Sequence, residues 1–219
     1  TLAKGGTSFE CAVSNNPLCM PARSSLLSGH FSRTCQGHLK NCMDEYPKES
    51  RKNWLSNKTL GEILKSNGYK TNLTGKWHIQ PSPGLLGFEE FVYPKVSHRH
   101  TSQTFVNDKG EKFVPEQFSP EYEAEQAESF LSREHNEPFF LFYNISPPHM
   151  PLADAPDKYL NMYNSKDIHL RLNVFESGQT AYNEEWFKIY LWDYLYYREH
   201  LAHTEKIPKR FDLRKLTAM

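Results

Sequence analysis

The sequence of 219 residues has few cysteines, no net charge and no long apolar run. Its four cysteines are too few for a disulfide framework and show no Cys-x-x-Cys spacing of the kind that binds zinc. The 26 basic residues balance the 26 acidic ones, so the chain as a whole has no charge that would attract nucleic acid or a membrane surface. No apolar stretch approaches the roughly 20 residues that span a bilayer.

The sequence has many aromatic residues and is long enough to form a hydrophobic core. Aromatics make up 14% of the chain, which excludes a disordered protein. The length suffices for a hydrophobic core without a cysteine scaffold. Cys35 and Cys42 are close enough in sequence to pair in an oxidising compartment, but proximity does not fix the geometry of a disulfide, so this pairing stays open.

Helix and strand signals alternate along the chain. A capping box that begins at Thr59 opens one helix, and a strand is expected over 69–74. A second helix, with Ser119 as its N-cap, is expected as far as residue 133, before an aromatic-rich buried strand over 139–145. The alternation predicts an α/β fold with a mostly parallel sheet, whose functional groups gather at the carboxyl ends of the strands.

Two stretches carry weaker signals. Residues 82–116 are rich in Pro and Gly and are expected to be mostly loop. Residues 182–200 are dense in Trp, Tyr and Phe. Aromatics at helical spacing usually fill cores, so an amphipathic helix or packed insertion is favoured there over a ligand-binding surface.

The most informative run is 19–29, which reads CMPARSSLLSG. Because Pro21 is tolerated only in the first turn of a helix, Cys19 lies at or just before a helix N-terminus, and Arg23 follows one turn later. A sulfur, a guanidinium and free backbone N–H groups around one point favour an anion. On these residues alone, a structural cysteine beside a surface arginine is equally compatible. Ser25 stands where a Cys-x5-Arg phosphatase would need arginine.

Three runs together resemble the type I sulfatases. Residues 19–29 are similar to that family's first signature, Cys-x-Pro-x-Arg-x-x-Leu-Leu-x-Gly, with Ala22 in place of the commoner Ser. Residues 68–78 are similar to the second, Gly-Tyr-x-Thr-x-x-x-Gly-Lys-x-His, and 139–151 resemble a family strand that ends in Pro-His-x-Pro. The resemblance covers nearly the whole chain and implies an alkaline-phosphatase-like α/β fold with a sheet flanked by helices.

The resemblance also implies roles for five residues. Cys19 is oxidised to formylglycine by a maturation enzyme, and one hydroxyl of the hydrated aldehyde attacks the sulfur of a sulfate ester. Arg23 fixes the nucleophile loop and offsets negative charge, while Lys76 binds the sulfate oxygens. Since alternate residues of an extended segment point to one side, His78 is expected beside Lys76, where it orients the hydrated aldehyde. His149 binds sulfate and assists the leaving oxygen as a proton donor.

Two further features are fainter. A Gly-Phe-x-x-Phe run at 87–91 with a following Ser-His is similar to some arylsulfatases, in which such a serine contacts sulfate, and this points to Ser97. His98 and His100 form a His-x-His pair, which we expect to be solvated rather than metal-bound because loop histidines usually are.

The metal-binding acids of the family are the missing part of the pattern. Members carry an Asp-Asp pair upstream of the cysteine motif and an Asp-Asn or Asp-His pair downstream, which hold Ca2+ together with the formylglycine. Ca2+ needs about six to eight oxygen ligands, and this chain offers little beyond modified Cys19. We therefore expect residues 1–219 to be part of a sulfatase catalytic domain, with its sheet incomplete at both ends, the remaining Ca2+ ligands elsewhere and little activity by itself.

The resulting hypothesis is a sulfuric ester hydrolase that acts on a small-molecule or carbohydrate sulfate ester in a periplasmic, secreted or lysosomal setting. One alternative is a phosphoester or phosphonate monoester hydrolase that uses the same formylglycine site, because both substrates are tetrahedral oxyanions. The other is a non-catalytic, sulfatase-like binding domain. No nucleic-acid partner and no membrane span are expected.

Overall fold

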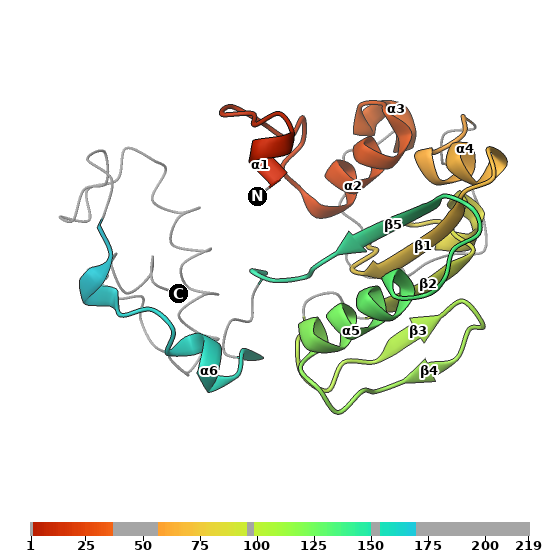
Figure 1. Ribbon diagram of the computed structural model, residues 1–219. Helices are drawn as coiled ribbons and strands as arrows, with labels where there is room; N and C mark the ends of the chain where they lie inside the picture. Colours follow the sequence, from red (N-terminus) through yellow and green to blue (C-terminus); the bar gives the residue numbers. More distant parts are fainter. Residues whose placement is uncertain (1, 37–56, 96–98, 150–153, 170–219) are drawn as a thin grey trace.

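The structure is a computed structural model that describes residues 2–36, 57–95, 99–149 and 154–169 (Figure 1). Ser97, His98, Cys42 and the aromatic stretch 182–200 lie outside the described residues, so the expectations about Ser97, His98 and the aromatic stretch stay predictions. None of the described helices is long and apolar enough to cross a membrane.

A five-stranded sheet forms the centre of the described chain, in the order β4-β3-β2-β1-β5 (Figure 1). Its strands are β1 Lys70–Gly75, β2 Glu90–Pro94, β3 Phe105–Asn107, β4 Lys112–Phe113 and β5 Phe139–Asn144. β1 pairs in parallel with β2 and with β5, whereas β2–β3 and β3–β4 are antiparallel. The α/β class is confirmed. The sheet is mixed because the short strands β3 and β4 join it in antiparallel pairs, and these two strands and β2 come from the stretch expected to be loop.

Helices lie on and around this sheet. They are α1 Leu2–Gly5, α2 Cys19–Ser28, α3 Ser32–Gln36, α4 Leu60–Ser66, α5 Ser119–Leu131 and α6 Asp157–Leu160, with 3-10 turns at Pro83–Leu86 and Ser165–Asp167. α4 and α5 both pack against β1, and α2 packs against α3 and α4. Figure 1 shows α5 crossing one face of the sheet, with the start of α2 near the carboxyl end of β5.

The capping box of α4 is confirmed in detail. Thr59 Oγ1 accepts from the Glu62 N–H at 3.3 Å, and Glu62 Oε2 accepts from the Thr59 N–H at 2.8 Å. α2 begins at Cys19, as the position of Pro21 indicates. α5 begins one residue early: Ser119 is its first residue and Phe118 is the cap, without a side-chain hydrogen bond.

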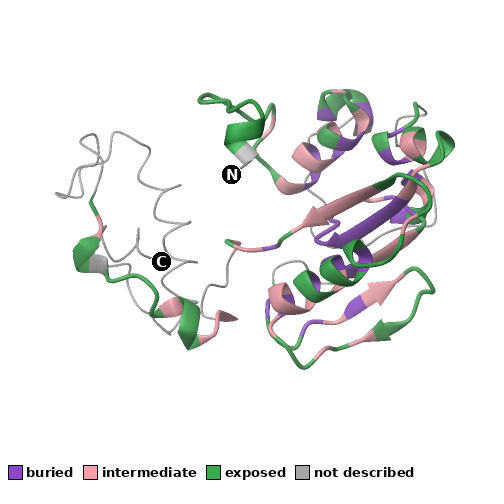
Figure 2. Cartoon of the chain, viewed as in Figure 1, coloured by how far each residue is buried: buried purple, intermediate pink, exposed green. Residues whose placement is uncertain are grey.

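The core lies around β1 and draws on α2, which precedes this strand, and on the segments that follow it. It consists of seven buried side chains: Leu27, Leu73, Trp77, Ile79, Leu86, Phe88 and Tyr93. Trp77 meets Phe88 edge-on at 5.6 Å, and Phe88 stacks on Phe140 and Phe142 at 6.0 and 5.9 Å. Figure 2 shows the same concentration of buried residues along β1.

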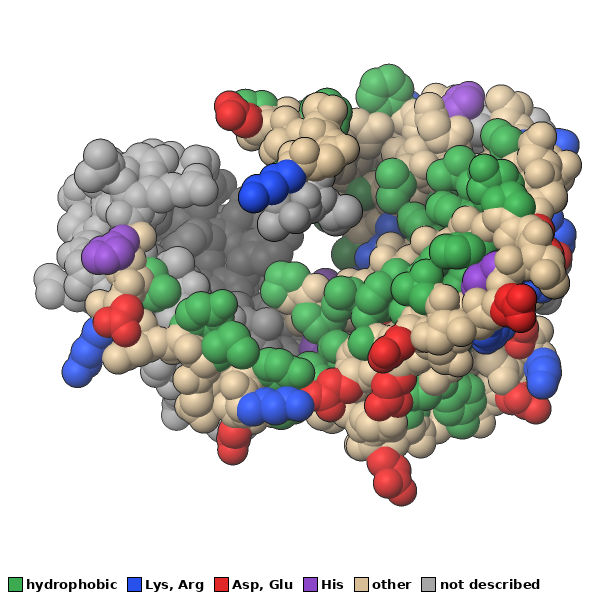
Figure 3. All heavy atoms as spheres, in the orientation of Figure 1, with side chains coloured by type: hydrophobic (Ala, Val, Ile, Leu, Met, Phe, Trp, Pro, Cys, Tyr) green, Lys and Arg blue, Asp and Glu red, His purple; other side chains and the backbone are tan. Residues whose placement is uncertain are grey.

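β5 is less buried than its aromatic sequence predicts. Its side chains are half-buried, and Phe139 is 40% exposed. The reason is its place in the sheet, because β5 is an edge strand among the described residues and packs fewer neighbours than a central strand. Hydrophobic side chains accordingly gather over β5 on the face shown in Figure 3.

Candidate active site

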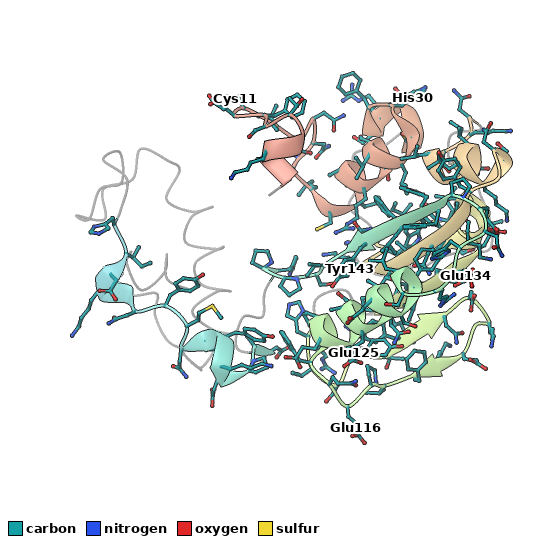
Figure 4. All side chains as sticks on the ribbon, in the orientation of Figure 1. Cys11, His30, Glu116, Glu125, Glu134 and Tyr143 are labelled. Carbon is teal, nitrogen blue, oxygen red and sulfur yellow. The ribbon has the colours of Figure 1, made fainter. Side chains whose placement is uncertain are left out.

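The first part of the site is the N-terminus of α2. Cys19 is the first residue of this helix and is partly exposed, and Arg23 follows on the next turn. Residues four apart lie on one face of a helix, so the thiol and the guanidinium are directed to the same side. Cys11, by contrast, is an exposed free thiol on the segment between α1 and α2 (Figure 4). Cys35 is a free, buried thiol.

The second part is the carboxyl end of β1. The strand stops at Gly75, whose φ of 89° is open to glycine but strained for other residues. A Cβ at this position would lie 2.2 Å from the carbonyl oxygen of Asn144 on β5. The next residue, Lys76, donates its N–H to that same oxygen at 2.8 Å. The close approach of β1 and β5 thus places Lys76 at the point where both parallel strands end.

His78 does not follow the expected extended path. The strand has already ended at Gly75, and His78 has a φ of 50°. The alternation of side chains along a strand therefore does not apply to Lys76 and His78. Both are nonetheless buried, with 2% and 3% of their surface exposed. The role of His78 stays a prediction.

The two parts meet in a cluster of three residues. Lys76 Nζ lies 3.8 Å from Cys19 Sγ, and Arg23 Nη1 donates to the backbone carbonyl of Lys76 at 2.9 Å. Burial lowers the pKa of Lys76; the nearby Cys19 opposes this change and the Arg23 charge adds to it. Lys76 thus places its amino group beside the sulfur, and Arg23 bonds to the backbone of the same residue. A lysine and an arginine gathered at the end of β1 are side chains suited to hold an oxyanion.

His149 contacts His100, a residue to which the sequence assigned no role. His149 lies in the turn after β5, with its N–H donating to Ser146 O at 3.2 Å, and its own carbonyl lies 2.8 Å from His100 Nε2. The expectation that His100 is solvated is wrong, since it is 2% exposed. Burial lowers the pKa of His100, and the nearby charges of His149 and Lys76 lower it further, against the bond to His149 O and the Asp154 charge.

Glu123 is the second residue that sequence reasoning missed. It lies on α5, is fully buried, and neither carboxylate oxygen has a hydrogen-bond partner among the described residues. Burial raises its pKa from 4.5 to about 8, against the attraction of Arg23. A signal existed, because Glu123 shares one helix face with the buried Ala127 and Phe130.

The described residues do not form a Ca2+ site by themselves. Among them, no group of three or more His, Cys, Asp or Glu side chains could hold a metal ion. The amino group of Lys76 lies beside Cys19 Sγ, whereas Ca2+ requires oxygen ligands.

These contacts define a class of protein. A cysteine that begins a helix, with a buried lysine from the carboxyl end of a parallel strand beside it, is typical of an α/β domain whose functional groups gather at that edge of the sheet. The Sulfatase family profile matches residues 1–182, so the chain belongs to the sulfatase family. Members of this family generally use formylglycine and Ca2+.

Curated relatives and solved structures agree with this assignment. The chain is 30% identical over 195 residues to an ulvan-active sulfatase of Formosa agariphila, covering 84% of this chain and 36% of the relative. It is 26% identical over 180 residues to an N-acetylglucosamine-6-O-sulfatase of Bacteroides thetaiotaomicron, covering 80% and 30%. The solved structure of BT4656 with its substrate D-glucosamine-2-N,6-O-disulfate shares the fold, with a TM-score of 0.62, 23% identity, and 78% and 33% coverage. The chain thus spans about a third of the length of these proteins.

Proposed function

We propose that the protein that carries this chain hydrolyses sulfate esters, with residue 19 as the site of the nucleophile. The observation that carries the proposal is the 3.8 Å approach of Lys76 Nζ to Cys19 Sγ, with Arg23 bonded to the Lys76 carbonyl. These residues come from two sequence motifs more than fifty positions apart, and the fold brings them to one point. An oxyanion bound there would lie against both the nucleophile position and two positive charges.

The chain's own residues have separate tasks in this proposal. Lys76, as a buried cation, attracts the sulfate oxygens through a point charge that is strong because water is largely excluded. Arg23 ties α2 to the end of β1, so that the helix N-terminus stays against the anion. His149 donates a proton to the leaving oxygen, His78 orients the nucleophile, and Ser97 contacts sulfate.

Formylglycine at position 19 would supply a hydrated aldehyde that can attack sulfur and later release sulfate. This proposal requires a maturation enzyme that recognises the cysteine motif at 19–29. Calcium binding by the modified residue stays a prediction, which requires oxygen ligands from outside the described residues.

The substrate class that fits the relatives is a sulfated carbohydrate. Two of them are named for ulvan and for N-acetylglucosamine-6-O-sulfate, and we carry this preference to the present protein as part of the proposal. A protein that hydrolyses sulfated carbohydrates of this kind would lie outside the cytosol, in a periplasmic, secreted or lysosomal setting.

Mass spectrometry of the peptide that contains Cys19, combined with sulfate release, tests the proposal. The whole protein is produced in a host that forms formylglycine and assayed with 4-nitrophenyl sulfate and a sulfated sugar. We expect residue 19 to carry the aldehyde and Cys19→Ala to lose activity. Cys11→Ala should retain it, because that exposed thiol lies outside the motif. Full activity with an unmodified thiol at position 19 would refute the mechanism.

The same preparation separates the alternative activities. Greater turnover of an aryl phosphonate monoester than of the aryl sulfate would assign the site to phosphonate hydrolysis. A protein that binds sulfated sugar and releases no sulfate, although residue 19 is modified, would be a binding domain.

A further inference from the structure

Three separate parts of the fold meet on His100. Its backbone N–H donates to Asp154 Oδ2 at 2.8 Å, and its carbonyl accepts from the Ser119 N–H, at the start of α5, at 2.8 Å. Its ring Nε2 lies 2.8 Å from His149 O, and the ring stands edge-on to Phe118 with centroids 6.3 Å apart. Such a side chain is a fixed part of the structure and not a mobile loop group.

The proton on the His100 ring is assigned by its partner. A carbonyl oxygen only accepts, so Nε2 carries the hydrogen and Nδ1 carries the lone pair of the neutral ring. Burial lowers the pKa of His100, which favours this neutral form. Nδ1 has no hydrogen-bond partner within the described part of the chain. The ring's polar contact there is therefore its bond to the segment that carries His149.

That bond completes the fixation of the His149 backbone. The N–H of His149 donates to Ser146 O at 3.2 Å, and its carbonyl accepts from His100, so both polar backbone groups are held. With the backbone held, the His149 imidazole is left with rotation about its side-chain bonds.

We propose that His100 is a positioning residue for His149. Its Nε2–H···O=C hydrogen bond fixes the backbone from which the His149 imidazole reaches the leaving-group oxygen. The proposal deepens the proposed function and rests on it, because it takes His149 as the proton donor. As the nucleophile at position 19 forms its bond to sulfur, the bond from sulfur to the leaving oxygen breaks. The electron pair of that bond stays on the leaving oxygen, which takes a proton from His149. His100 itself neither gains nor loses a proton.

The expected effect follows from the distance dependence of proton transfer. A general acid acts at a heavy-atom separation of about 2.6–3.2 Å, and a displacement of about 1 Å costs about 10²-fold in rate. The loss falls on substrates whose leaving group needs a proton. A sugar alkoxide does, whereas 4-nitrophenolate leaves readily without one.

Two variants and two substrates test this. His100→Leu keeps most of the side-chain volume but removes the donor, and His100→Gln offers an amide N–H to the same carbonyl. In the whole protein we expect His100→Leu to lower kcat/KM for a sulfated sugar by about 10- to 100-fold, and to lower it for 4-nitrophenyl sulfate several-fold at most. His100→Gln should recover most of the loss on the sugar.

A His149→Ala background separates positioning from general damage to the fold. There the proton donor is already absent, so His100→Leu should not change the ratio of the two turnover rates further. Equal losses on both substrates, or an undiminished effect in the His149→Ala background, would overturn the positioning role. A wild-type protein that cleaves neither sulfate ester overturns the proposed function, and this inference with it. A wild-type protein that cleaves both, with unaffected His100 variants, overturns this inference alone.

Discussion

The buried carboxyl of Glu123 gives a prediction that can be worked out from the structure. Its pKa of about 8, against an ordinary value of 4.5, means that the folded protein holds this proton more tightly than the unfolded chain does. At about 1.4 kcal/mol for each tenfold change in proton affinity, the fully ionised carboxylate costs the folded state about 5 kcal/mol. At pH 7, where most folded molecules still carry the proton, the cost is about 3 kcal/mol, and at pH 5.5 it is about 1 kcal/mol.

The sign of the pH dependence follows from the same comparison. Because the pKa of the folded state is raised, the stability linked to Glu123 is present at low pH and is lost as the pH rises from 4.5 through about 8. Glu123→Gln removes this titration. Its buried amide also lacks a described partner, which adds a cost of about 1–3 kcal/mol that does not depend on pH. The gain in stability over wild type should therefore grow by about 3 kcal/mol between pH 5.5 and 8.5.

Urea denaturation of wild type and Glu123→Gln at pH 5.5, 7 and 8.5 measures this difference in unfolding free energy. Glu128→Gln is the matched control, because it removes one negative charge from an exposed position on the same helix. It should shift the unfolding free energy by a few tenths of a kcal/mol at most. A difference between wild type and Glu123→Gln that stays constant with pH, or shrinks as the pH rises, would show that burial does not perturb this carboxyl.

Three further predictions follow from single contacts. Gly75→Ala should lower the melting temperature strongly, because its Cβ would lie 2.2 Å from Asn144 O. Gly110→Ala is the control: Gly110 has a similar φ of 77° and nothing within 4 Å of such a Cβ, so its loss of stability should be only about 1 kcal/mol. Equal losses of stability in the two variants would contradict the close approach of β1 and β5. Thr59→Ala should cost about 1–3 kcal/mol in urea denaturation, because it removes both the α4 cap and the bond from the buried hydroxyl to Leu86 O. Thr59→Ser, which keeps the hydroxyl, should cost clearly less. Lys76→Met should lower kcat/KM for sulfate esters by about 10²–10³-fold without lowering stability, since the variant no longer buries a charge. Lys65→Met, on the exposed surface of α4, is the control. Similar kinetics for both variants would show that Lys76 is not part of the site.

Local signals account for the parts of the fold that could be predicted. The capping box at Thr59, the position of Pro21 and the aromatic run of β5 each depend on neighbours in sequence, and each marks an element that the structure contains. β3 and β4 have three and two residues, too few for a periodic pattern, so the sequence between residues 82 and 116 resembled loop. The partial exposure of β5 depends on its place at the edge of the sheet, which no local pattern records.

The site likewise contains residues that the sequence predicts and residues that it does not. Cys19, Arg23 and Lys76 belong to motifs whose spacing is itself the signal, and the structure brings them into contact. His100 and Glu123 belong to no such motif, and the burial of His100 depends on contacts with distant parts of the chain, such as the turn after β5. An isolated histidine in a loop has the same sequence appearance whether it is solvated or enclosed, and the sequence signal for Glu123 is limited to the helix face that it shares with Ala127 and Phe130.

The bond from Arg23 ends on the main chain of residue 76 and not on its side chain. Any amino acid at that position offers the same carbonyl, and any except proline also keeps the N–H that bonds to Asn144 O, so the tether between helix and strand survives these replacements of the lysine. Directed evolution could therefore randomise position 76 to seek preference for a different anion while the architecture around the nucleophile stays assembled. Position 23 does not share this freedom, since there the side chain is the tether.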